Sequence, residues 1–393
     1  MASYSWAVIC TYPGEPWLEE LGSWPKISFQ GKTPRQIAAI KNSTQYRLNT
    51  IRLSLLRIEP RIIIEPLIVA VGLLQGREKP LCALFSLIGD YFVPANSNWI
   101  LPAKQQFVEQ VFLPAFEYRA SIRSPEAFET TTRVERCLFA VFVKFAELMT
   151  EKQLKPVWTE LISWAEDALK PEADISLRIR MITLLHLANH FYESFNTLAI
   201  PYFGRLIELS ARVLRTCNTA TTDSAQLFLH GGKESIEGLE CDLALIQSID
   251  LIRSCAKHRE FFTEERADLV IQPLVAELEN SKCAGHEARC VPHLADAIYQ
   301  VSDAHPNKFA NMLNEIFQKT RSRKPKIRYR TLLMVERLFD KIGDSIAPHL
   351  PMVMPFISEL LEDENKNVAD QCDKIVRLLQ MKFGAELNQA FTT

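Results

Sequence analysis

The sequence predicts an all-α fold, an α-solenoid in which antiparallel helix pairs stack one upon the next. Three observations predict it: apolar residues recur at helical spacing, glycine is scarce at 13 of 393 residues, and helix pairs recur along the chain. Tight hairpins and phosphate-binding loops need glycine because they use positive φ. The composition therefore disfavours a many-stranded β protein and a Rossmann or P-loop enzyme.

The last helix pair has the clearest pattern. Its two predicted helices are separated by the acidic turn Glu362-Asp363-Glu364, and Gly384 is predicted to end the second one. Each helix carries one apolar stripe at the spacing of an amphipathic helix. The first stripe is Ile346, Leu350, Val353, Ile357, Leu360 and Leu361, and the second is Val368, Cys372, Ile375, Val376, Leu379 and Phe383.

A proline followed by bulky apolar residues tends to recur at a similar place in the first helix of the pairs. These prolines are Pro114, Pro156, Pro201, Pro273 and Pro355. Their intervals are 42, 45, 72 and 82 residues, of which the last is two steps and the third is one step with an insertion. A two-helix period of about 40 residues indicates HEAT or armadillo repeats. One pair cannot bury its apolar faces alone, so stacking supplies the core.

The predicted domain organisation follows from these pairs. Residues 1–33 read as an irregular N-terminal cap or tail, and residues 34–103 as less regular helical repeats. Residues 104–393 read as the HEAT-repeat array, with a flexible loop at 218–238 that is rich in Thr, Ser and Gly. The expected pairs are 104–149, 151–194, 200–258, 264–304, 306–342 and 346–383.

Charge and cysteine usage place the chain in a broad class. Lys+Arg (45) nearly balance Asp+Glu (47), so the chain as a whole is neither a basic nucleic-acid binder nor a membrane protein. Nine cysteines without any CxxC indicate reduced thiols inside the cell. The most apolar stretch, 62–74, is interrupted by Glu65 and Pro66 and is shorter than the ~20 residues of a membrane span. We expect no membrane interaction.

Two short motifs resemble a nucleotide-binding loop and a zinc-protease site, but each lacks a residue that its motif requires. The sequence Gln30-Gly31-Lys32-Thr33 resembles the end of a P-loop, but the required first glycine is replaced by Lys26. His186 and His190 stand four residues apart on one helix face, but Leu187 replaces the glutamate of a zinc protease motif. The histidines are predicted to be structural. The sequence predicts no catalytic residues, no cofactor and no small-molecule substrate, and therefore a protein that is not an enzyme.

One cluster of cysteines and histidines leaves a zinc site as an alternative interpretation. Cys283, His286, Cys290 and His293 bring four possible zinc ligands within eleven residues. Cys290 also lies on an apolar stripe with Leu294, where a thiol packs as a small apolar group. Because the usual C-x₂-C spacing is absent, the prediction is no metal.

One local charge feature stands out. Between Lys319 and Arg330 there are seven basic residues in twelve, and Pro325 marks the start of the next helix. Turns of successive repeats line one edge of a solenoid, so the cluster predicts an electropositive ridge for RNA phosphates. An acidic partner, a nuclear import signal or a solvated turn are the alternatives. This basic turn comprises Lys319, Arg321, Arg323, Lys324, Lys326, Arg328 and Arg330.

Several blocks of sequence resemble one known family, the HEAT-repeat U3 small nucleolar RNA-associated protein of the small-subunit processome, in its C-terminal region. The resemblance covers 104–393 well and 35–103 weakly. It rests on PKIRYRTLLMVERL (325–338), LPMVMPFISELLED (350–363), residues 368–387, FTEERADLVIQPLVAELEN (262–280), and VKFAELM (143–149) through WAED (164–167).

The resemblance implies a non-catalytic scaffold in nucleolar small-subunit ribosome biogenesis, acting in pre-rRNA transcription and processing toward 18S rRNA. The implied location is the nucleus and nucleolus. The implied partners are other processome proteins, with pre-rRNA or snoRNA reached through the basic turn. Family members are several times longer, so we expect a fragment or a short relative. The alternative is a generic HEAT-repeat adaptor for transport or cytoskeletal partners.

Overall fold

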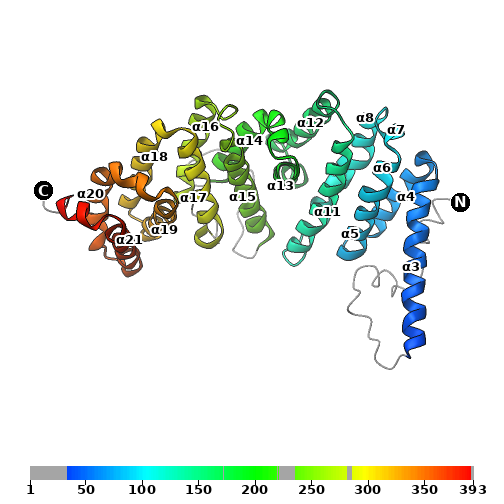
Figure 1. The fold of residues 1–393 in the computed structure, drawn as a ribbon, viewed down its shortest axis with the longest axis horizontal. Helices are drawn as coiled ribbons and strands as arrows, with labels where there is room; N and C mark the ends of the chain where they lie inside the picture. Colours follow the sequence, from blue (N-terminus) through cyan, green and yellow to red (C-terminus); the bar gives the residue numbers. More distant parts are fainter. Residues whose placement is uncertain (1–32, 171, 219, 221–234, 281–285, 391–393) are drawn as a thin grey trace. The chain divides into compact units, whose positions relative to one another are not determined.

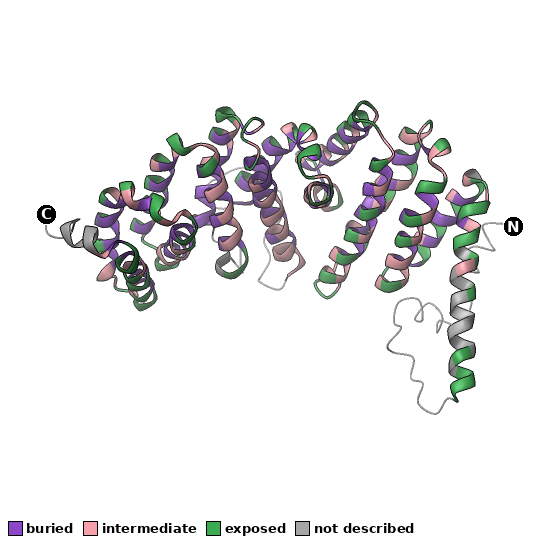
Figure 2. Ribbon diagram, viewed as in Figure 1, coloured by how far each residue is buried: buried purple, intermediate pink, exposed green. Residues whose placement is uncertain are grey.

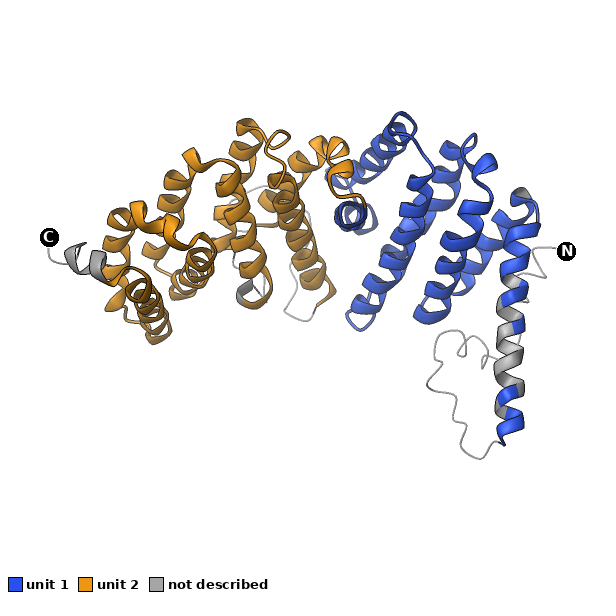
Figure 3. Cartoon of the chain, viewed as in Figure 1, with its two compact units in different colours: residues 1–194 blue, residues 195–393 orange. Residues whose placement is uncertain are grey.

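The structure, a computed structural model, describes residues 33–170, 172–218, 220, 235–280 and 286–390 (Figure 1). All regular secondary structure in these residues is helical, which confirms the all-α prediction. The predicted cap at 1–33 lies outside the described residues except for Thr33, as does most of the predicted loop at 218–238. The chain divides into two compact units, residues 1–194 and 195–393, which are coloured separately in Figure 3.

Unit 1 consists of longer helices joined by short helical segments. Thr33 begins the first of them, since its Oγ1 accepts a hydrogen bond from the Gln36 backbone N–H. The helix bounds are α3 (Pro34–Arg57), α4 (Pro60–Leu73), α5 (Glu78–Leu87), η1 (Ile88–Phe92), α6 (Val93–Ala95), α7 (Ser97–Ile100), α8 (Lys104–Phe107), η2 (Val108–Phe112), α9 (Leu113–Phe116), α10 (Tyr118–Ser121), α11 (Phe128–Glu147), α12 (Glu151–Glu166), η3 (Asp167–Leu169) and α13 (Ile175–Phe195).

Unit 2 is a regular stack of helix pairs. Its second helices α15, α17, α19 and α21 pack side by side in chain order (Figure 1). The bounds are η4 (Asn196–Tyr202), α14 (Gly204–Cys217), α15 (Ile236–Ala256), α16 (Glu264–Ala276), η5 (Glu277–Glu279), α17 (His286–Ala304), α18 (Pro306–Gln318), η6 (Lys319–Arg321), α19 (Pro325–Ile342), η7 (Gly343–His349), α20 (Leu350–Leu361) and α21 (Lys366–Ala390). The predicted α-solenoid architecture is confirmed.

The recurring prolines occupy three kinds of position. Pro156, Pro273 and Pro355 lie inside α12, α16 and α20. Pro201 lies in the 3₁₀ segment η4, and Pro114 lies in the first turn of α9 directly after a π-helical segment. Each proline lacks the backbone donor that an α-helix needs, and the chain accommodates that loss differently from repeat to repeat.

One predicted boundary is wrong. Gly384 was expected to end the last helix, but α21 continues to Ala390. The helix is instead interrupted at Phe383, whose φ of −128° and ψ of 22° are not helical. The chain therefore bends one residue before the glycine and resumes helical structure beyond it.

Apolar stripes hold the stack together. Buried residues lie along the helix faces that pack on neighbouring helices, as Figure 2 shows. In α17 the predicted stripe of Cys290, Leu294 and Ile298 is at most 1% exposed. Burial of such side chains contributes roughly 1.5–3 kcal/mol each and is the main stabilising term. None of the helices in the described part of the chain is both long and apolar enough to cross a membrane.

Candidate interaction surfaces

The predicted basic turn is divided between three structural elements. Lys319 and Arg321 lie in η6, Arg323 and Lys324 lie in the turn, and the other three cations lie on α19, which begins at Pro325 as predicted. Arg330 is 1% exposed, and its Nη1 donates to the Asn280 backbone carbonyl at 2.5 Å. The inclusion of Arg330 in an exposed ridge is therefore wrong, because this residue belongs to the core.

Three further cations of the basic turn form ion pairs with neighbouring repeats. Lys319 Nζ lies 2.6 Å from Glu279 Oε2 in the preceding pair. Arg321 donates to both carboxylate oxygens of Glu359 on α20, at 2.9 and 2.6 Å. Arg328 does the same to Asp363, at 2.6 and 2.7 Å. Because these partners are 35–40 residues away in sequence, the turn connects one repeat to the next.

The carboxylates respond electrostatically to these cations. Hydrogen bonding from Arg328 lowers the pKa of Asp363, and hydrogen bonding from Arg321 lowers the pKa of Glu359. Both acids are therefore held in the charged form that neutralises the arginines. The electropositive ridge expected from the sequence is correspondingly reduced.

Two cations of the basic turn remain available. Within the described part of the chain, the exposed side chains of Arg323 and Lys324 have no ion-pair partner. Lys326 is exposed on the first turn of α19. The surface that can meet a phosphate or an acidic side chain is thus centred on Arg323 and Lys324.

Charged residues also link the second helices of unit 2. The Asp296 carboxylate on α17 lies 3.4 Å from Arg253 Nη1 on α15 and 3.0 Å from Lys341 Nζ on α19. His293 Nδ1 lies 2.8 Å from Asp250 Oδ1 on α15. Each of these contacts joins the second helix of one pair to the second helix of the next. Polar contacts therefore accompany the apolar packing between successive pairs.

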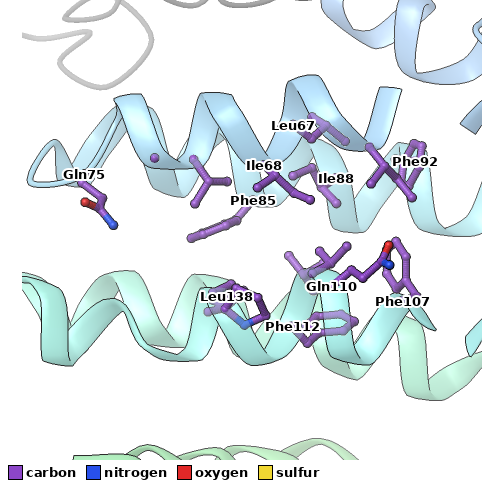
Figure 4. Close-up of a pocket in the computed structure, with 17 residues that line it drawn as sticks. Leu67, Ile68, Gln75, Phe85, Ile88, Phe92, Phe107, Gln110, Phe112 and Leu138 are labelled. Atoms are coloured by element: carbon purple, nitrogen blue, oxygen red, sulfur yellow. The ribbon is translucent and has the colours of Figure 1, made fainter. Parts of the chain in front are cut away.

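Unit 1 contains an apolar groove that the sequence did not indicate. The groove has a cavity of about 230 Å³. Figure 4 shows Leu67, Ile68, Phe85, Ile88 and Phe92 on one side, facing Phe107, Gln110, Phe112 and Leu138 on the other. A neighbouring cavity of about 350 Å³ shares Ile64, Phe107, Gln110 and Val111 with it.

Polar and exposed apolar residues complete the groove. At one end Gln75 donates to the Ser121 hydroxyl at 3.4 Å. On α4, the lining residue Ile68 is 40% exposed. An apolar recess with a small number of polar groups is the usual chemistry of a binding pocket.

Two π-helical segments line this groove. The Val93 N–H bonds to the Ile88 carbonyl and the Leu113 N–H to the Val108 carbonyl, each five residues back. In both cases proline follows at once, at Pro94 and Pro114. A proline cannot donate to the carbonyl four residues back and its ring clashes there, so the wider π turn accommodates it.

A sequence signal for the groove does exist. Phe-Val-Pro-Ala at 92–95 is followed by Phe-Leu-Pro-Ala at 112–115, and both phenylalanines line the groove. The series of recurring prolines in the sequence analysis includes Pro114 but not Pro94. The repeated Phe-x-Pro-Ala motif around these two prolines is the sequence signal for the groove.

The histidine and cysteine predictions have separate outcomes. His186 is buried, and its Nδ1 lies 3.1 Å from Glu135 Oε2, which is a structural role. Cys290 is buried in the α17 stripe and His293 pairs with Asp250, while Cys283 and the His286 side chain lie outside the described residues. No group of three or more metal-binding side chains occurs in the part of the chain that was described. In the P-loop-like sequence Thr33 is a helix cap, and residues 30–32 lie outside the described residues.

The stacked antiparallel pairs, with ion pairs one repeat apart, define a helical-repeat protein of the HEAT type. Comparisons with known proteins agree. Residues 101–262 match the BP28CT (NUC211) domain. The chain is 41% identical over 375 residues to the HEAT repeat-containing protein 1 homolog of Caenorhabditis elegans, covering 93% of this chain and 23% of that protein.

Further relatives are named either HEAT repeat-containing protein 1 or U3 small nucleolar RNA-associated protein 10. HEAT repeat-containing protein 1 of Homo sapiens is 29% identical over 304 residues, covering 74% of this chain and 13% of that protein. U3 small nucleolar RNA-associated protein 10 of Meyerozyma guilliermondii is 23% identical over 287 residues, covering 70% of this chain and 15% of that protein. The chain is a relative of these proteins, which confirms the resemblance found in the sequence. It spans less than a quarter of the length of each.

Proposed function

We propose that this chain is a non-catalytic scaffold in small-subunit ribosome biogenesis, acting in the nucleolus within the small-subunit processome. The observation that carries the proposal is the 41% identity to a HEAT repeat-containing protein 1 over 93% of the chain. The relatives reported above carry HEAT-repeat and snoRNA-association names rather than enzyme names. A helical stack suits this role because it offers a long surface made of many turns and helix faces.

Two surfaces supply the contacts in this proposal. The cations of Arg323 and Lys324 suit RNA phosphates, each neutralised phosphate releasing counterions. The apolar groove of unit 1 suits the apolar side chains of a protein partner. The proposed partners are therefore other processome proteins, with pre-rRNA or snoRNA contacted at the turn.

Depletion of the protein in its source organism tests the function. The expected results are nucleolar localisation of the tagged chain and, on depletion, accumulation of unprocessed precursor with loss of 18S rRNA. A diffuse cytoplasmic signal together with normal precursor levels would reject the proposal. That outcome would favour an adaptor for transport or cytoskeletal partners.

A further inference from the structure

Two cysteine thiols lie against each other beside the groove of unit 1. Cys82 on α5 and Cys137 on α11 are both free, half-buried thiols, and each is the largest influence on the pKa of the other. Phe85, one turn beyond Cys82, and Val141, one turn beyond Cys137, both line the groove. The thiol pair therefore lies between α5 and α11, two of the helices that line the groove.

An ion pair one turn earlier shows the register of these two helices. Arg133 Nε lies 2.5 Å from Glu78 Oε1, and its Nη2 lies 3.0 Å from Oε2. Glu78 precedes Cys82 by four residues and Arg133 precedes Cys137 by four, so the two contacts have the same offset along parallel helices. Close approach continues beyond the thiols, since a Cβ added to Gly89 would lie 3.5 Å from the Val141 Cα.

We propose that Cys82 and Cys137 are a redox modification site, at which hydrogen peroxide forms an intramolecular disulfide that ties together α5 and α11, two helices that line the groove. This inference is independent of the proposed function. It rests on the helix register and on the contact between the thiols. A disulfide needs two sulfurs held side by side by the backbone, and the packing of α5 on α11, in the register that the Glu78–Arg133 contact shows, supplies that arrangement.

The electrostatics assign different roles to the two sulfurs. A hydrogen bond from Cys82 lowers the pKa of the Cys137 thiol to about 7, while the same contact raises the pKa of Cys82. A thiolate is the nucleophile in thiol oxidation. The lower pKa favours Cys137 as the sulfur that attacks the peroxide, with Cys82 resolving the product; the reverse order gives the same disulfide.

The chemistry balances in two steps. The Cys137 thiolate attacks the peroxide, so an S–O bond forms, the O–O bond breaks, and the released hydroxide takes up a proton to become water. The Cys82 sulfur, giving up its proton, then attacks the Cys137 sulfenic acid, so an S–S bond forms and the hydroxyl leaves as a second water. Two thiols lose two electrons, and the peroxide gains them.

Peptide mapping of the full chain after treatment with hydrogen peroxide tests the proposal. The expected result is a linked peptide pair joining Cys82 to Cys137, which dithiothreitol separates. C82S and C137S should each abolish this link, and C82A repeats the test if C82S alters the circular dichroism spectrum. C217S is the matched control and should retain the link, because Cys217 is a buried thiol whose hydrogen-bond partner is a different cysteine, Cys241.

Two results would overturn the proposal. The first is recovery of Cys82 and Cys137 unlinked, either alkylated or as separate sulfinic acids, under conditions that oxidise other thiols of the chain. The second concerns the groove and is read by amide hydrogen exchange in α4 and η2. Exchange there should slow several-fold in the linked protein, so an unchanged rate in protein shown to be linked would exclude an effect on the groove.

Discussion

Arg328 on α19 donates to both carboxylate oxygens of Asp363, the acid in the turn between α20 and α21. The same carboxylate accepts the Asn365 backbone N–H at 2.8 Å, so it also shapes the start of α21. The two side chains are 14% and 6% exposed. This arrangement makes the basic turn a structural connection between repeats, with only part of its charge left for a partner.

The first prediction concerns this connection. Arg328→Ala should destabilise unit 2 by about 2 kcal/mol, because it leaves a mostly buried carboxylate without its charged donor. Urea denaturation of the two proteins measures the loss. Arg323→Ala is the control, since its exposed side chain has no ion-pair partner among the described residues, and it should change stability by less than about 0.5 kcal/mol. Equal effects of the two substitutions would contradict this description of the turn.

A second prediction concerns RNA. Reversing both free cations, Arg323→Glu with Lys324→Glu, should reduce RNA binding and lower the salt dependence by about one to two phosphate contacts. Filter binding at several salt concentrations measures both quantities. Reversal of Lys152 and Lys155, two exposed lysines on α12, is the matched control for net charge. RNA binding that falls equally in the control would point to non-specific attraction.

The third prediction concerns Glu135 in unit 1. Burial alone would raise its pKa, but Arg119 and His186 hold the pKa at about 2. The unfolded carboxyl titrates near 4.5, so the folded state binds fewer protons between these values. Stability should therefore be present above pH 4.5 and be lost as pH falls toward 2.

Substitution checks the same network at neutral pH. Glu135→Gln leaves Arg119, which is 2% exposed, without its counter-charge and should cost about 3–5 kcal/mol. Glu129→Gln on the same helix is the control because its side chain is 88% exposed. Thermal unfolding at pH 7 and at several acid values separates the two variants. A Glu135→Gln protein as stable as the control would rule out the buried network.

The fourth prediction concerns Glu277, where the pH dependence of stability has the opposite sign to that of Glu135. Burial raises the pKa of Glu277 to about 8, although hydrogen bonds from Asn280 and Asn218 oppose the shift. The folded state therefore binds more protons than the unfolded state between pH 4.5 and 8, so stability should fall as pH rises through this range. Glu277→Gln should remove that fall and be the more stable protein at pH 8, by on the order of 1 kcal/mol or more. Glu260→Gln, an exposed carboxyl, should leave the pH dependence as in the natural sequence.

The helices of the repeats were predictable because apolar periodicity is a local property. In the α21 stripe Val368, Cys372, Ile375 and Leu379 are buried as their spacing indicates, whereas Val376 is half-buried. The predicted helix end at Gly384 was wrong because a glycine permits a helix to end without requiring it. The helix bends at Phe383 instead.

The interaction surfaces were only partly predictable. The basic residues of 319–330 are visible in the sequence, but the acids that neutralise them, Glu279, Glu359 and Asp363, come close only when repeats stack. The groove combines residues from Ile64 to Val141, and two π turns contribute to its lining. Neither feature can be found from the composition of a single helix.

The central claim is that this chain is a scaffold within the small-subunit processome, and crosslinking followed by affinity purification tests it most directly. Tagged protein is crosslinked in cells of the source organism and purified under denaturing conditions, and the attached RNA and proteins are identified. The account predicts enrichment of pre-rRNA or U3 snoRNA together with processome proteins over a tagged unrelated helical-repeat protein. Recovery of transport or cytoskeletal proteins, with RNA at the level of that control, would contradict it.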